Sequence, residues 1–255
     1  MQLGLPVSTL LAFLLVLARV GGFVAFLPLP GFRNAPESIR AALAVMLTLA
    51  LFPSWPSLEN TLPSISQLTL WCFSEAGFGL AVGLSVSLLT EGFQLGAQVL
   101  GMQAGYGYAT SIDPTSQADS GVLQILTMLM TGLLLFSLGI DRELLRLLGA
   151  SFTRFPAGTW APTAASLDTL VRLGGDMFAI GLRMAMPVIA LLLLIDLSLA
   201  LIGRMQQQLQ LLSLAFPLKM LAAVATLAAL TPLLAKLFSA SAQHTMDTLW
   251  RSLGA

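Results

Sequence analysis

The chain of 255 residues carries 12 Lys and Arg against 12 Asp and Glu, and only 9% of its residues are charged, against about 25% in soluble domains. Apolar residues make up 56% and the mean hydropathy is +0.87, which excludes a soluble globule, because such a protein needs a far more polar surface. Zero net charge without a basic run excludes nucleic acid as the main partner, and the single cysteine and single histidine exclude an internal disulfide and a zinc cluster.

Six apolar stretches are candidates for membrane helices, which need about 20 mostly apolar residues each. Their Leu- and Ala-rich composition favours helix and lacks the alternation of barrel strands. In chain order they are Leu5–Leu27, Ile39–Phe52, Ile65–Met102, Gly121–Ile140, Met177–Ile202 and Leu214–Leu234. The sequence therefore predicts an all-α integral membrane protein, or a subunit buried in a large apolar assembly.

The first stretch reads as a retained helix, because residues 1–18 contain no Lys or Arg and the apolar run continues past Arg19. The third stretch is too long for one crossing: as one helix it measures about 57 Å, nearly twice the hydrocarbon core of about 30 Å. It either bends, at Gly92 or Gly96, or projects beyond the bilayer.

Short polar segments connect the stretches. Residues 52–67 and 155–167 contain several prolines and are expected to be loops. Residues 141–148 place Leu144, Leu147 and Leu148 on one helical face and Arg142 and Arg146 on another, which predicts a short amphipathic helix at an interface. With six crossings, six of the basic residues counted lie on the side of the N-terminus and three on the other, which favours a cytoplasmic N-terminus.

The most distinctive segment is residues 101–121, which contains both tyrosines of the chain, Tyr106 and Tyr108, and several glycines. One interpretation is a flexible loop between helices. The other is a re-entrant or plugging loop, since irregular backbone at membrane depth persists only against protein or a water-filled cavity, and a glycine-rich, mainly uncharged loop can occlude a pore by packing. Glycine pairs four residues apart, at 79/83, 92/96 and 101/105, favour close helix packing.

Ionisable residues inside apolar helices are costly and are usually paired or functional. Those in this chain are Arg19, Glu75, Glu91, Asp176, Arg183 and Asp196. They indicate buried ion pairs or residues facing an assembly interior, while an ion relay of Arg183 with Asp176 or Asp196 stays open as the alternative. No nucleophile elbow and no nucleotide-binding loop occurs, so we expect no enzyme activity and no cofactor or metal.

Three segments together match a known pattern in order and spacing. The first comprises Arg19, Pro28, residues 36–40 (Pro-Glu-Ser-Ile-Arg) and Pro53. The second comprises Glu91, residues 101–105 (Gly-Met-Gln-Ala-Gly) and residues 109–114 (Ala-Thr-Ser-Ile-Asp-Pro). The third comprises residues 186–187 (Met-Pro), 204–205 (Arg-Met) and 216–219 (Phe-Pro-Leu-Lys). Over residues 10–240 the chain resembles the FliR family of type III secretion export-gate subunits, whose injectisome counterpart is SctT.

The resemblance implies an inner-membrane subunit of the flagellar basal body that assembles with FliP and FliQ into the export gate, joined by FlhB and FlhA. The gate conducts unfolded flagellar proteins. Residues 1–155 would correspond to a FliP-like part and residues 168–240 to a FliQ-like helical hairpin, within one domain of residues 1–255. Met102 would lie near the pore gasket. The plug loop of the family falls on Gly105, Tyr106, Gly107, Tyr108, Ala109, Thr110, Ser111, Ile112, Asp113, Pro114, Thr115, Ser116 and Gln117.

Two rivals remain, and an intramembrane enzyme is a third alternative. The closer one is a gate subunit of the SctT type in a virulence injectisome. The more distant one is a self-sufficient secondary transporter that uses Arg183 with Asp176 or Asp196. An intramembrane enzyme would have to rely on Asp176 or His244, for which the sequence provides no partner motif.

Overall fold

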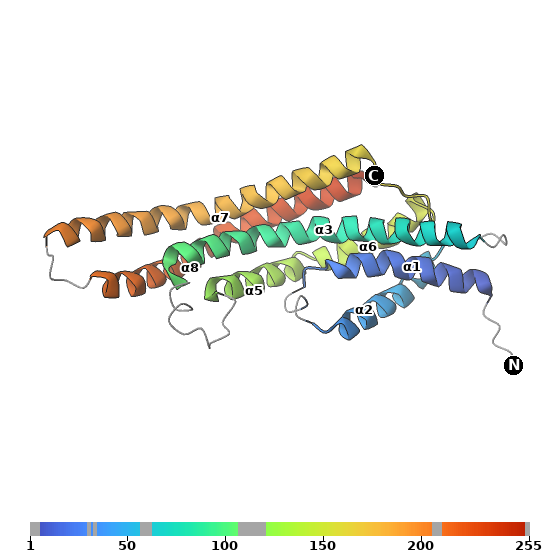
Figure 1. The fold of residues 1–255 in the computed structure, drawn as a ribbon, viewed down its shortest axis with the longest axis horizontal. Coiled ribbons are helices and arrows are strands. Elements are labelled where there is room, and N and C mark those ends of the chain that lie inside the picture. Colours follow the sequence, from blue (N-terminus) through green and yellow to red (C-terminus); the bar gives the residue numbers. More distant parts are fainter. Residues whose placement is uncertain are drawn as a thin grey trace. The chain divides into compact units, whose positions relative to one another are not determined.

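The computed structural model describes residues 6–29, 32, 35–56, 63–106, 121–205 and 211–252, and within them it contains helices and no strand (Figure 1). The all-α prediction is thus confirmed. The elements are α1 (Val7–Ala25), α2 (Glu37–Ala50), the 3-10 turn η2 (Phe52–Ser54), α3 (Ile65–Ala104), α5 (Val122–Ser137), α6 (Ile140–Arg154), α7 (Ala164–Met205) and α8 (Leu211–Ser252).

Each of the six apolar stretches coincides with a helix. Among the described residues, α1, α3, α7 and α8 are long and apolar enough to cross a membrane, and α5 with α6 adds a fifth if the bent pair is one span. The second stretch forms only the 14-residue α2, about 21 Å long, which is too short for a bilayer core of about 30 Å. The orientation of the chain was predicted on the assumption of six crossings. The lengths of the described helices support four or five crossings.

The long third stretch is one helix of 40 residues, α3, and it is not interrupted at Gly92 or Gly96. Two other helices are longer than the sequence indicated: α7 begins at Ala164 and α8 continues to Ser252. Hydropathy detects only the apolar part of such a helix, while helix-forming residues continue it into polar sequence. Pro187 in α7 and Pro217 and Pro232 in α8 lie inside these helices.

The amphipathic segment is α6. Gly139, in the left-handed conformation with φ 69°, separates it from α5. Leu144, Leu147 and Leu148 are buried while Arg142 and Arg146 are exposed, as the sequence pattern predicted.

The chain divides into two compact units, each made of separate chain segments. The first consists of residues 1–88, 135–173 and 243–255. In it α1 packs closely against the beginning of α3, because Gly22, Gly79 and Gly83 let the two backbones touch. A Cβ at Gly83, for example, would lie 2.6 Å from the carbonyl oxygen of Phe23. This contact brings Arg19 of α1 next to α3.

The second unit consists of residues 89–134 and 174–242. Here α3 approaches α7 closely at Gly92 and Gly96: a Cβ at Gly96 would lie 2.8 Å from the carbonyl oxygen of Gly181. The rings of Phe93 and Phe238 meet edge to face at 5.3 Å and are fully buried. Helices α7 and α8 run in opposite directions within this unit (Figure 1). The packing role predicted for the pairs 79/83 and 92/96 is confirmed.

Candidate functional site

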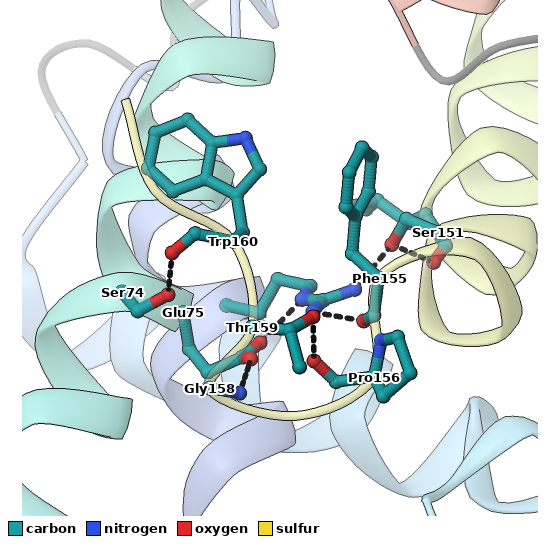
Figure 2. A network of polar contacts seen from close by, with 10 residues as sticks. Ser74, Glu75, Ser151, Phe155, Pro156, Gly158, Thr159 and Trp160 are labelled. Atoms are coloured by element: carbon teal, nitrogen blue, oxygen red, sulfur yellow. Dashed lines mark hydrogen bonds and ion pairs between the residues drawn. The ribbon is translucent and has the colours of Figure 1, made fainter. Parts of the chain in front are cut away.

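The first candidate site is a polar network around Arg19, whose side chain has no exposed surface. Its Nε donates to Oε2 of Glu75, which is equally buried. One terminal nitrogen donates to Oγ of Ser151 at 2.7 Å and the other to the carbonyl oxygen of Phe155 at 3.0 Å (Figure 2). The guanidinium thus joins α1 to α3, to α6 and to the loop that follows α6.

The second oxygen of Glu75 holds the same loop. Its Oε1 accepts a hydrogen bond of 2.8 Å from the backbone N–H of Gly158, which has φ +76°. Next to it, Ser74 donates its hydroxyl to the carbonyl oxygen of Trp160. Figure 2 shows Ser74 and Glu75 side by side, with Gly158 and Trp160 facing them. The loop of residues 155–160 is therefore fastened by two adjacent residues of α3.

Aromatic rings enclose the ion pair. The guanidinium carbon of Arg19 lies 4.2 Å from the ring centre of Phe152 and 4.8 Å from that of Phe78, within the range of cation–π attraction. A buried ion pair gains little net stability, because desolvation offsets the Coulomb attraction, but removal of one partner leaves an uncompensated charge. The arrangement is thus suited to holding α1, α3, α6 and the following loop together, since the hydrogen-bonding groups of both charged side chains are occupied.

The pocket beside the network is lined by residues without an ionisable side chain. It is open and measures about 370 Å³, and Phe78, Phe155 and Trp160 are among its lining residues. Among the described residues no group of three or more His, Cys, Asp or Glu side chains is placed to hold a metal ion.

The second candidate site is the start of the predicted plug loop, of which Gly105 and Tyr106 are described. Residues 107–117 lie outside the described residues. Gly105 has φ +86°, and a Cβ there would lie 2.6 Å from Cδ1 of Phe216. The hydroxyl of Tyr106 donates to the carbonyl oxygen of Met220 in α8 at 3.2 Å. Burial raises the pKa of Tyr106 above its usual value of 10.0, so the phenol stays a hydrogen-bond donor at neutral pH.

The remaining sequence-predicted residues are dispersed. Met102 is 64% exposed near the end of α3. Glu91 is half-buried, and it has an interaction partner. Asp176 and Arg183 are both exposed on α7.

Asp196 forms an ion pair with Lys219 of α8, whose Nζ lies 3.0 Å from both carboxylate oxygens. The structure does not bring Asp196 to Arg183. Because these two are thirteen residues apart on one helix, they are separated by about 20 Å along its axis.

Sequence reasoning missed several members of these sites: Ser151, the carbonyl of Phe155, the N–H of Gly158, and Lys219 as the partner of Asp196. The carbonyl of Phe155 and the N–H of Gly158 are backbone groups, and every residue type except proline provides both groups, so their contacts leave no trace in the sequence. The proline and glycine of residues 155–158 marked a loop but not its contact with Glu75. Lys219 lies inside an apolar stretch. Because a charged side chain at membrane depth is costly, this position could have identified Lys219 as a residue that needs a partner.

Comparison with known proteins gives a consistent result. The family model described as "Bacterial export proteins, family 1" matches residues 10–245. The flagellar biosynthetic protein FliR of Escherichia coli (strain K12) is 30% identical over 220 residues, which is 86% of this chain and 84% of that protein. The protein of the same name from Bacillus subtilis (strain 168) is 31% identical over 216 residues, covering 82% of this chain and 81% of that protein. The one from Caulobacter vibrioides is 25% identical, over 84% and 86% of the two chains.

Proposed function

The chain belongs to family 1 of the bacterial export proteins, and from this membership we propose that it is a subunit of the flagellar protein export apparatus in the bacterial inner membrane. The relatives described above carry the flagellar name and match over more than four-fifths of their length. In the described part of the chain four helices are long and apolar enough to cross a membrane, or five if α5 and α6 form one span, which is compatible with a membrane component.

Within that apparatus the chain forms, together with FliP and FliQ, the channel that passes unfolded flagellar proteins, with FlhB and FlhA as further partners. The observation that carries this proposal is the exposure of α7 and α8. Each has 42 residues, about 63 Å, yet the apolar windows of the two helices are only 17% and 22% buried. Exposed large apolar side chains extend along α7 from Leu167 to Ile202, about 53 Å. Because the hydrocarbon core is only about 30 Å thick, neighbouring subunits have to cover the remaining exposed apolar surface.

In the same proposal the two parts of the chain correspond to different subunits of the gate. Residues 1–155 act as a FliP-like part and residues 168–240 as a FliQ-like hairpin. Support for the second assignment comes from α7 and α8, which run in opposite directions and are joined by the pair of Asp196 with Lys219. A chain of this kind can contact both types of neighbour in one assembly.

Residues 105–117 occlude the closed channel in this proposal, and Met102, exposed next to them, contributes to the constriction. The loop keeps ions out and moves aside for a substrate. Partner proteins supply the energy, because the sequence contains no nucleotide-binding loop.

The composition of the native complex tests the main proposal. The tagged chain is extracted in mild detergent from its own cells and measured by native mass spectrometry. We expect a fixed large complex with two other small hydrophobic proteins. A stable monomer or homodimer without them would overturn the export-gate proposal and favour the transporter. Genomic neighbours distinguish a flagellar system from an injectisome of the SctT type.

Deletion of residues 107–111 tests the occluding loop. Membrane vesicles that contain the complete complex with this deletion should leak potassium ions, whereas vesicles with the unaltered complex should not. If the deletion complex assembles in normal amount and stays ion-tight, the loop does not occlude the channel.

The transporter rival loses support from the geometry. Along α7, Arg183 lies about 20 Å from Asp196 and about 10 Å from Asp176, and Asp196 is engaged by Lys219. That rival still predicts uptake of a small solute by the purified chain alone in liposomes, abolished by Asp196→Asn, and we expect no such uptake.

A further inference from the structure

The end of α3 rests on two turns of α8. Gly105 brings its backbone against the ring of Phe216, in a conformation with φ +86° that a residue with a side chain rarely adopts. One residue later, Tyr106 directs its hydroxyl to the carbonyl oxygen of Met220, 3.2 Å away. Two successive residues of the chain thus contact α8 one turn apart, at positions 216 and 220.

The hydrogen bond to Met220 does not require the helix to open. A backbone carbonyl oxygen has two lone pairs, so one inside a helix can accept a second donor besides the N–H of its own helix. A partly buried phenol without such a partner loses a hydrogen bond that water would otherwise provide. The hydroxyl of Tyr106 therefore attaches this side chain to α8.

The same two turns of α8 are held from another direction by α7. Lys219 lies between Phe216 and Met220 in sequence, and its Nζ contacts both carboxylate oxygens of Asp196 at 3.0 Å. The side chain of Lys219 is only 13% exposed, while that of Asp196 is 42% exposed. The segment of residues 216–220 thus receives the end of α3 and is tied to α7.

We propose that Tyr106 is a positioning residue, which fastens the end of α3 to residues 216–220 of α8, so that the α7–α8 hairpin sets where the chain leaves α3. The inference rests on the proposed occluding role of residues 105–117. It assigns Tyr106 the role of an anchor, distinct from residues that fill the channel.

Tyr106→Phe tests the anchor, because it removes one hydroxyl and keeps the ring. The measurement is passive potassium leak through membrane vesicles that contain the full complex, normalised to the amount of complex. We expect the leak to rise roughly two- to tenfold, the factor that corresponds to the net value of one hydrogen bond. Thr226→Val is the matched control, since Thr226 donates only to the carbonyl oxygen of Ala222 within α8, and its leak should not change.

A second variant alters the neighbouring contact, between Gly105 and Phe216. In Gly105→Ala the new Cβ has to displace the ring of Phe216, so the same leak is expected even if Tyr106→Phe assembles poorly. Combination of Tyr106→Phe with Asp196→Asn should raise the leak by less than the product of the two single effects, because both act on the same segment of α8.

The outcomes separate this inference from the function on which it rests. If the deletion of residues 107–111 leaks and Tyr106→Phe and Gly105→Ala are both ion-tight, the anchor is overturned and the occluding loop stands. If the deletion is ion-tight, the occluding loop is overturned, and the anchor with it. If the leak of the double variant equals the product of the effects of Tyr106→Phe and Asp196→Asn, the two residues do not act on the same segment of α8, and this part of the inference is overturned.

Discussion

Arg19 and Glu75 are 56 residues apart in the sequence and form an ion pair in which neither side chain reaches solvent. Glu75 uses its other oxygen to hold the N–H of Gly158, and Arg19 uses its remaining nitrogens to hold Ser151 and Phe155. Four separate segments of the first unit therefore depend on two charges that compensate each other.

Glu75→Gln should destabilise the first unit severely, because Arg19 would keep its buried charge without a counter-charge. The expected loss is about 3–5 kcal/mol, seen as a lower thermal unfolding temperature of the complex in detergent and as faster degradation of the chain in cells. The double change Arg19→Met with Glu75→Met should be much milder, since it removes both charges.

The matched control is Arg172→Met, which breaks the exposed pair of Asp168 and Arg172 at 2.7 Å on α7. Exposed pairs of this kind contribute about 0–1 kcal/mol, so unfolding should hardly change. Equal effects of Glu75→Gln and Arg172→Met would contradict a special role of the buried pair.

Gly96→Val should separate α3 from α7. A Cβ at Gly96 would lie 2.8 Å from the carbonyl oxygen of Gly181 and 3.0 Å from the sulfur of Met184, and the backbone of Gly181 cannot yield without moving α7. We expect a loss of about 1–3 kcal/mol, as for overpacking in general, measured by thermal unfolding of the complex.

Gly101→Ala on the same helix provides the comparison, because a Cβ at Gly101 meets no described residue within 4 Å. Alanine is favoured over glycine in a helix by about 1 kcal/mol, so the chain itself should be slightly stabilised. Assembly that fails only with Gly101→Ala would instead place a partner subunit against this position.

Asp196→Asn should loosen the α7–α8 hairpin by about 1 kcal/mol, discounted because the carboxylate is partly exposed. The exchanged pair Asp196→Lys with Lys219→Asp should recover most of that loss. Asp176→Asn serves as the control, as Asp176 is exposed on the same helix. The readout is protease sensitivity between residues 196 and 219, and a loss that the exchange does not recover would argue against a simple ion pair.

The anchor at Tyr106 should not depend on pH in the physiological range. Burial raises the pKa of Tyr106 above 10.0. The phenol is the donor, so its contribution is fully present below the unfolded pKa of about 10 and is lost only as pH rises through the higher folded value. The potassium leak of the unaltered complex should therefore be constant from about pH 6 to 9. A leak that rises with a midpoint inside this range would show that another group controls it.

The sequence anticipated the helices well and their ends poorly. Apolar runs of the length of α1 and α3 were sufficient to predict helix, because lipid-exposed backbone has to satisfy its hydrogen bonds internally. The polar beginning of α7 at Ala164 and the polar end of α8 at Ser252 were missed, since hydropathy reports contact with lipid and not helix length.

In the candidate sites, too, the sequence identified some residues, while their partners were found only in the structure. The cost of charge in an apolar helix identified Arg19, Glu75 and Asp196 as residues that need partners. A relay of Arg183 with Asp176 or Asp196 was the alternative that the sequence left open, whereas the structure pairs Asp196 with Lys219. A spacing of thirteen residues along a helix keeps two side chains about 20 Å apart. The residues three and four positions from Asp196 are Leu or Ala, so its partner has to come from a neighbouring helix.

Composition and hydropathy by themselves therefore determined that this is an all-α chain of the membrane, and the order of its short motifs indicated its family. Tertiary structure alone decided which charges meet, that residues 155–160 are held by α3, and that the end of α3 rests on α8. The physical reason is that burial and secondary structure follow from local sequence, while ion pairs and backbone hydrogen bonds between distant segments depend on how helices pack side by side.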